Sequence, residues 1–277
     1  MTKLTVTVIT RNESAHIDAC LASVAWADEV LVVDCGSTDG TADLARARGA
    51  RVLLRDWPGY SAQKNFAAGE AAHDWILSVD ADERVTPALS EEIRRQLAAP
   101  TGPSSAGYRV PRVTWHLGRW IRTTDWYPDF QLRLYDRRRA RWKPKRVHES
   151  VELDAASGAA GQLGHELEHY AYRDISHHLE TMNRYTTLAA EEMHAAGRRA
   201  NTWDLVAHPA AAFLRNYVLR RGFTDGAPGL IISSMNAHYV FLKFAKLWAL
   251  ARQQPPQAGG PPSVGGNFEV RTSKFEV

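Results

Sequence analysis

The chain has 277 residues, of which 44% are hydrophobic and 23% are charged. These ordinary globular values exclude a wholly disordered or collagen-like chain, and the length allows one large α/β domain or a domain with an appendage. Lys and Arg number 34 against 31 Asp and Glu, so the net charge of +3 does not by itself indicate a nucleic-acid-binding protein. Two cysteines, Cys20 and Cys35, cannot form a disulfide scaffold, which favours a reducing compartment.

We expect neither a targeting segment nor a membrane-spanning segment. The N-terminal sequence turns polar at Arg11, too early for the apolar core of a signal peptide. The sequence contains no run of about 18 uncharged apolar residues, so it predicts no transmembrane helix. We therefore expect a protein that is soluble or bound to a membrane surface.

The first third of the chain alternates strand-like and helix-like patterns. The expected strands are 4–9, 30–33, 52–54 and 75–79. The expected helices are 13–24, 41–48, 61–72 and about 86–98. Thr86 followed by Pro87 is typical of an N-cap and a first helical position. Strands and helices that alternate at this spacing predict βαβ units and a mostly parallel sheet.

The rest of the chain changes in character twice. Residues 107–153 contain strands and aromatic-rich loops, and helical patterns follow at 176–196, about 203–220 and about 230–251. The Pro- and Gly-rich end of the chain predicts a disordered tail. The expected division is a catalytic α/β domain over 1–155, a helical region over 156–252 and a tail over 253–277.

Polar residues follow three of the expected strands, at 10–13, at Asp34 and at 80–82. Each group alone is typical of a turn or helix cap, but three together indicate a ligand site, because ligands of open parallel sheets bind at the carboxyl ends of the strands. No G-x-G-x-x-G follows the first strand, which disfavours a nicotinamide enzyme. Asp80 and Asp82 could both reach one Mg²⁺ or Mn²⁺ ion, which would neutralise a departing diphosphate.

The string DCGSTDGT at 34–41, with SVDADE at 78–83, resembles the motifs of the family 2 inverting glycosyltransferases. The resemblance covers about residues 4–150 and implies the GT-A fold, a Rossmann-like and mostly parallel sheet with flanking helices, and a nucleotide-diphosphate sugar as donor. Further segments are similar to the bacterial lipopolysaccharide core glucosyltransferases, which add β-glucose to an inner-core heptose. These segments are 64–67, 126–135, 147–150 and 221–226.

The resemblance also implies which residues form the site. Those implied to bind the nucleotide sugar are Arg11, Glu13, Asp34, Asp39, Lys64, Asp80 and Arg133. Asp82 and His148 are implied to bind the metal, Mg²⁺ or Mn²⁺. Asp39 could equally cap the helix that begins at Thr41, Lys64 could be an exposed helical lysine, and Glu83 is expected to cap the next element.

Inversion is a single displacement at the anomeric carbon, so it needs one base that takes the proton of the acceptor hydroxyl. The resemblance places Asp129 in that role, within the segment 128–133. Asp125 is the nearest rival. The alternative is that Asp129 only forms a turn after Pro128.

The helical region interleaves apolar and aromatic residues with Arg and Lys over 213–223 and 239–248. Helices that lie on an anionic bilayer have this pattern, and so do helices that pack on a domain with a basic edge in water. We expect a cytoplasmic enzyme, peripheral on the inner membrane, that transfers glucose from a UDP-sugar to a lipid-linked glycan such as the lipopolysaccharide inner core. The alternatives are a nucleotidyltransferase and a non-catalytic membrane scaffold on the same fold.

Overall fold

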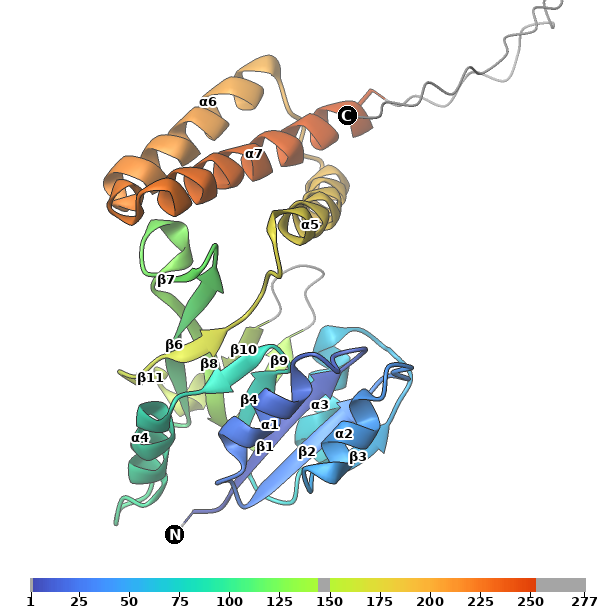
Figure 1. Ribbon diagram of the computed structural model, residues 1–277, viewed down its shortest axis with the longest axis vertical. Coiled ribbons are helices and arrows are strands. Elements are labelled where there is room, and N and C mark those ends of the chain that lie inside the picture. The colour runs from blue at the N-terminus through green and yellow to red at the C-terminus, as the bar shows by residue number, and fades with distance from the viewer. Residues whose placement is uncertain (1, 144–149, 253–277) are drawn as a thin grey trace, which may run out of the picture.

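The computed structural model describes residues 2–143 and 150–252 (Figure 1). Four parallel strands form the first half of the main sheet, in the order β3 (Arg51–Leu54), β2 (Glu29–Asp34), β1 (Leu4–Thr10) and β4 (Trp75–Asp80). The predicted parallel sheet is thereby confirmed.

The helices of this half are α1 (Ile17–Val24), α2 (Thr41–Ala47), α3 (Tyr60–Glu70) and α4 (Pro87–Leu97). Thr86 accepts a hydrogen bond from Leu89 N, and Pro87 holds the first helical position, so the predicted start of α4 is confirmed. The helix expected from Glu13 begins only at Ile17, because residues 14–16 form a turn.

The second half of the sheet is mixed. β8 (Asp129–Asp136) runs antiparallel to β4, and β6 (Gly107–His116), β12 (Leu167–His169) and β5 (Glu83–Val85) follow in that order. β7 (Arg119–Ile121) and β11 (Gly161–Gln162) pair with β6, while β9 (Ala140–Lys143) and β10 (Ser150–Leu153) form a separate pair. The sheet thus extends beyond residue 155, where the sequence placed the start of the helical region. Short 3₁₀ turns, η1 (Thr124–Trp126) and η2 (Ala155–Ser157), connect the strands.

Helices cover both faces of the parallel strands. On one face, residues of α1 and α4 belong to the same buried cluster as Val6, Val8 and Val32. On the other face, Ala67 of α3 packs against Leu31 and Val33. Because the strands are buried on both faces, they appear in the sequence as short continuous apolar runs.

Three helices follow the sheet, α5 (Ile175–Ala195), α6 (Thr202–Leu214) and α7 (Ala227–Leu250). α6 and α7 lie side by side at the end of the molecule opposite the parallel strands (Figure 1). The helix expected over 203–220 stops at Leu214 and continues as a π-helical turn, η3 (Arg215–Leu219), and a 3₁₀ turn, η4 (Gly222–Asp225). Within the described part of the chain, no helix has the length and apolar character needed to cross a bilayer. The predicted α/β class with a C-terminal helical segment is confirmed.

A cluster of four rings, two of them buried and two partly buried, joins the helical region to the sheet. Its members are His116, Trp126, Tyr172 and His178, whose ring centroids lie 4.1–5.6 Å apart. Burial lowers the pKa of His178 to about 4, and the neighbouring His116 acts in the same direction. The cluster is therefore uncharged near neutral pH and packs as aromatic surface.

Candidate active site

The carboxyl ends of β1, β2 and β4 meet at one edge of the sheet. Thr10 pairs with Asp34, and Ile9 pairs with Asp80, so the register brings the segments after all three strands together. The polar groups that the sequence analysis placed after separate strands are thus neighbours in space. This edge is where an open parallel sheet binds ligands.

Asp34 shapes the turn that follows β2. Its Oδ1 accepts hydrogen bonds from Gly36 N at 3.0 Å and Ser37 N at 2.9 Å. Its Oδ2 accepts from Thr10 Oγ1 at 2.8 Å and Ser37 Oγ at 2.5 Å. The side chain is 1% exposed and accepts four hydrogen bonds from Thr10, Gly36 and Ser37, so its predicted contact with the nucleotide sugar stays a prediction.

Asp39 and Arg11 lie at the outer rim of the same edge. Asp39 accepts hydrogen bonds from Thr41 Oγ1 and N at 2.5 and 3.1 Å and from Ser14 N at 3.0 Å. These bonds, above all the one from Thr41, lower the pKa of Asp39. Asp39 therefore holds the turn that leads into α2, whose N-cap position is Gly40 and carries no side-chain cap. Arg11 is exposed in the turn after β1.

Glu13 lies between these turns and the aspartates after β4. Its backbone N donates to Thr41 Oγ1 at 2.8 Å. Burial, followed by the charges of Asp82, Asp39 and Asp80, raises the pKa of Glu13 to about 7. Glu13, Asp39 and Asp82, named here the acidic cluster, therefore concentrate negative charge.

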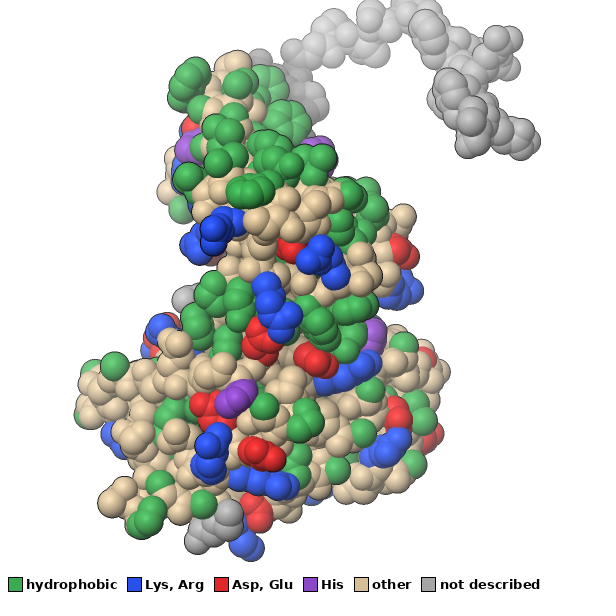
Figure 2. Space-filling model, turned by 60° about the vertical axis from the view of Figure 1, so that its left-hand side comes forward, with side chains coloured by type: hydrophobic (Ala, Val, Ile, Leu, Met, Phe, Trp, Pro, Cys, Tyr) green, Lys and Arg blue, Asp and Glu red, His purple; other side chains and the backbone are tan. Residues whose placement is uncertain are grey.

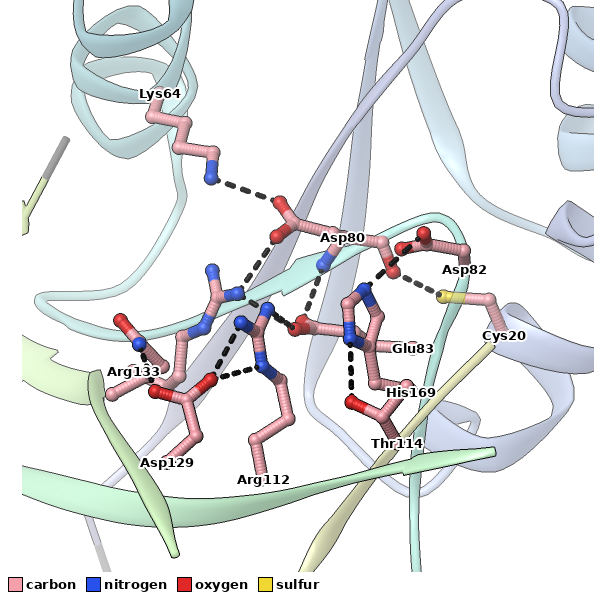
Figure 3. Close-up of polar contacts among 11 residues, drawn as sticks. Cys20, Lys64, Asp80, Asp82, Glu83, Arg112, Thr114, Asp129, Arg133 and His169 are labelled. Carbon is pink, nitrogen blue, oxygen red and sulfur yellow. Dashed lines mark hydrogen bonds and ion pairs between the residues drawn. The ribbon is translucent and has the colours of Figure 1, made fainter. Parts of the chain in front are cut away.

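Asp80 instead lies between two cations (Figure 3). Lys64 Nζ lies 2.9 Å from Oδ1, and Arg133 Nη2 lies 2.7 Å from Oδ2. Burial raises the pKa of Asp80, but the charges of Arg133 and Lys64 outweigh it and hold the pKa well below its usual range. Lys64 is only 4% exposed and lies over the ring of Trp142, so it is not an exposed helical lysine.

Glu83 is wholly buried and continues the same network. Its Oε1 accepts from Arg133 at 2.7 Å and from Arg112 at 3.1 Å, and its Oε2 accepts from Asp80 N at 2.9 Å. The expectation that Glu83 caps the next element was wrong, because Thr86 caps α4. Glu83 is the shared counter-charge of two buried arginines. Burial lowers the pKa of Arg133, but Asp80 and Glu83 outweigh it and raise that pKa.

Asp129 forms the far end of this network. Its Oδ2 accepts from Nε and Nη2 of Arg112 at 2.9 and 2.6 Å, and its Oδ1 accepts from Gln131 Nε2 at 2.5 Å. Its rival Asp125 is bonded to Arg215 and Asn216 in the helical region. Asp129 is therefore the aspartate that reaches the candidate site. We name the network the ion-pair chain; its members are Lys64, Asp80, Arg133, Glu83, Arg112 and Asp129.

Asp82 has a different partner, which the sequence analysis missed. His169 Nε2 lies 3.4 Å from Asp82 Oδ2, and His169 Nδ1 lies 3.4 Å from Thr114 Oγ1 (Figure 3). Burial raises the pKa of Asp82, but the hydrogen bond from His169 outweighs it. His148, the histidine that was predicted to bind metal, lies outside the described residues.

Asp82 and His169 together offer an oxygen and a nitrogen donor, which suit Mn²⁺ or Mg²⁺ with further ligands from water and phosphate. Over residues 2–143 and 150–252, no group of three or more His, Cys, Asp or Glu side chains is arranged to hold a metal ion. The acidic cluster supplies the negative charge that a cation would neutralise. The side chains present therefore fit a cation that is completed by a phosphate-bearing ligand.

Comparison with known proteins identifies the family of the chain. The family model for glycosyl transferase family 2 matches residues 5–152. The lipopolysaccharide core biosynthesis glycosyltransferase LpsC of Rhizobium meliloti is 31% identical over 88% of this chain and 92% of its own length. An uncharacterized glycosyltransferase of Rickettsia bellii is 30% identical over 92% of this chain and 89% of its own length.

Among solved structures, the mannosyl-3-phosphoglycerate synthase of Rubrobacter xylanophilus aligns with a TM-score of 0.46 and 17% identity over 73% of this chain and 77% of its own. The family model covers more than half of the chain, and LpsC aligns with nearly all of it. The chain therefore belongs to glycosyltransferase family 2.

Proposed function

We propose that this glycosyltransferase inverts the anomeric centre and transfers glucose from a UDP-sugar to a lipid-linked envelope glycan such as the lipopolysaccharide inner core. One observation carries the proposal. The acidic cluster, with His169 beside Asp82, adjoins an ion-pair chain that ends in the partly exposed carboxylate of Asp129. This arrangement supports a cation-and-diphosphate site next to a base, as a displacement at the anomeric carbon requires.

Asp82 and His169 would hold the divalent cation, Mg²⁺ or Mn²⁺. When bound, such a cation neutralises the charge that develops on a departing diphosphate. Glu13 and Asp39 would favour its binding by their charge. Among the described residues, neither side chain forms a hydrogen bond or ion pair with Asp82 or His169. Asp80, already paired with Lys64 and Arg133, would stay fixed and present the end of β4 toward the ribose or sugar.

Asp129 would accept the proton of the acceptor hydroxyl. Arg112 binds only one oxygen of this carboxylate, Oδ2. The other oxygen, Oδ1, accepts a hydrogen bond from Gln131, and an acceptor hydroxyl can replace that bond. Arg112 in turn is held by Glu83. The ion-pair chain would therefore keep the base in place while its outer oxygen receives the proton.

Support for the acceptor class comes from the relatives. LpsC acts in lipopolysaccharide core biosynthesis, as its name states, and it aligns with this chain over almost all of both lengths. A lipid-linked envelope glycan is therefore the acceptor class that we propose. Glucose is the transferred hexose that the sequence resemblance implies.

The test is a thermal-shift panel of UDP, GDP, CDP, ADP and dTDP, each with and without Mn²⁺. A ligand that binds only the folded state raises Tm according to its occupancy. We expect UDP to raise Tm, and Mn²⁺ to enlarge that shift. A shift with ADP or GDP in place of UDP would overturn the donor, and no shift with any nucleotide would favour a non-catalytic scaffold.

Two product assays complete the test. Incubation with UDP-glucose and an isolated lipopolysaccharide core should give a β-linked glucose, which the anomeric coupling constant identifies by proton NMR. An α-linked product would contradict inversion. Formation of a nucleotide sugar and pyrophosphate from a nucleoside triphosphate and a sugar phosphate would instead favour a nucleotidyltransferase.

A further inference from the structure

The helical region exposes large hydrophobic side chains to an unusual degree. Of the fifteen large hydrophobic side chains that are exposed in the described part of the chain, ten lie on α5, α6, α7 and the turns between them. Trp203 is 74% exposed and Leu219 is 76% exposed. Contiguous exposed apolar surface of this kind marks a site of protein or membrane contact.

Most of these side chains form one stripe and its tip, named here the α6 face. The stripe follows helical spacing along α6 into η3, and the tip lies at η3 and η4. The members are Trp203, Val206, Leu214, Val218, Leu219 and Phe223. Buried Ala212 and Asn216 lie on the opposite side of the same helical path, where α7 packs. The α6 face therefore points away from the rest of the molecule.

Charge decides which partner suits this face. Residues 198–252 contain eight Lys and Arg against two Asp, although the whole chain is only +3. Asp204 belongs to the capping box at the start of α6, and Asp225 is paired with Arg119, so neither offers the face a free negative charge. Figure 2 shows hydrophobic side chains over the end of the molecule that holds α6 and α7, with Lys and Arg at their margin.

The basic groups next to the tip are Arg215, Arg220 and Arg221, all exposed. Arg215 and Arg220 also pair with Asp125 on η1, which leaves each side chain more than half exposed. A second copy of this chain would bring like charges together. An anionic bilayer instead complements both the arginines and the apolar stripe.

We propose that the α6 face is a membrane-docking surface that lies in the interface of an anionic bilayer. The aliphatic and aromatic side chains of the stripe and tip enter the acyl boundary, and Trp203 sits at the level of the head groups. Arg215, Arg220 and Arg221 contact lipid phosphates. The inference rests on the proposed function only in taking the acceptor to be lipid-linked, and it gives that acceptor a surface on which to meet the enzyme.

The test is co-sedimentation of the full chain with vesicles of phosphatidylcholine alone and of phosphatidylcholine mixed with phosphatidylglycerol. We expect binding to the anionic vesicles that weakens with salt. A Trp203→Gln/Leu219→Gln variant should bind about tenfold more weakly, because two exposed apolar side chains are lost. Leu54→Gln is the matched control, since Leu54 is 67% exposed on β3, and it should bind as the wild type does.

The same samples are assayed for the Tm shift with UDP and Mn²⁺ and for mass in solution by light scattering. Wild-type protein that shows the Tm shift but does not bind anionic vesicles would overturn the docking surface and leave the proposed function intact. Equal vesicle binding by wild type and the double variant would also overturn it. A dimer that the double variant dissociates would assign the α6 face to self-association instead.

Discussion

The ion-pair chain and the acidic cluster lie side by side but are built in opposite ways. In the ion-pair chain, Lys64, Arg112 and Arg133 lie between three carboxylates, so every charge has an opposite neighbour. In the acidic cluster, by contrast, the carboxylates of Glu13, Asp39 and Asp82 have a single basic partner among the described residues. That partner is the imidazole of His169, within 4 Å of Asp82. The charges of the ion-pair chain are balanced without a ligand, whereas the acidic cluster has excess negative charge that a cation would neutralise.

This difference gives two different roles to two aspartates of the same sequence motif. Asp80 and Asp82 are two residues apart in one acidic motif, yet Asp80 is neutralised by buried cations and Asp82 is not. Buried ion pairs of the first kind fix geometry more than they add stability. We therefore propose that the ion-pair chain positions groups in the site, that the acidic cluster binds the cation, and that Asp129 at the end of the chain also meets substrate.

The largest effect is expected at that end. Asp129→Asn keeps the shape of the side chain and removes the base, so turnover should fall about 10²- to 10⁴-fold while the Tm shift with UDP and Mn²⁺ remains. Steady-state kinetics with UDP-glucose and an acceptor measures the loss. Asp125→Asn is the control, because Asp125 faces the helical region; a larger loss in that variant than in Asp129→Asn would exchange the two roles.

Breaking the ion-pair chain at its centre should cost the most stability. Glu83→Gln removes the carboxylate that Arg112 and Arg133 share inside the protein, and we expect the free energy of unfolding to fall by about 3–5 kcal/mol. Urea denaturation measures this change. Glu91→Gln on the exposed side of α4 should change it little. Equal stability of the two variants would show that the ion-pair chain is not a structural unit.

The sequence predicted the parallel half of the fold well because its signals are local. The apolar runs of β1, β2 and β4 and the Thr86–Pro87 pair each depend on near neighbours in the chain. The position of Asp82 was predictable for the same reason, because it follows the end of β4. The mixed half was less predictable, since β12 joins the sheet beside β5 only after an excursion of about eighty residues.

The partners of the charged residues could not be predicted for the same reason. Arg133 is predicted to bind the nucleotide sugar, and the antiparallel pairing of β4 with β8 brings it to Asp80, 53 residues away, a partner that the sequence did not predict. His169 gave a weak signal, a histidine two positions after Leu167 on a three-residue strand. The position of His169 beside Asp82 depends on the register of β12 with β5, and no local sequence pattern predicts that register.

A third variant tests the ligand-binding half of the comparison. Asp82→Asn should lower turnover about 100-fold or more, since a ligand of the cation is lost. It should also abolish the part of the UDP-dependent Tm shift that requires Mn²⁺. Asp43→Asn is the matched control, because Asp43 is an exposed carboxylate on α2. If Mn²⁺ still enlarged the UDP shift of Asp82→Asn, the acidic cluster would lose its assignment as the cation site.

The smallest effect is a change in the pH dependence of stability. The pKa of Glu13 is raised to about 7 in the folded chain from 4.5, so between these values the folded state holds a proton that the unfolded state releases. Stability must therefore fall as pH rises through this window and stay lower above it.

Glutamine resembles the protonated form, so Glu13→Gln should remove this fall in ligand-free protein. At pH 8 we expect the variant to be more stable by about 1 kcal/mol, since partial exposure screens the effect, or about 2–4 °C in Tm. At pH 4 the two proteins should melt together. Tm measured across the window by calorimetry tests this, and a variant less stable than wild type at pH 8 would mean that the acidic cluster carries no excess charge around Glu13.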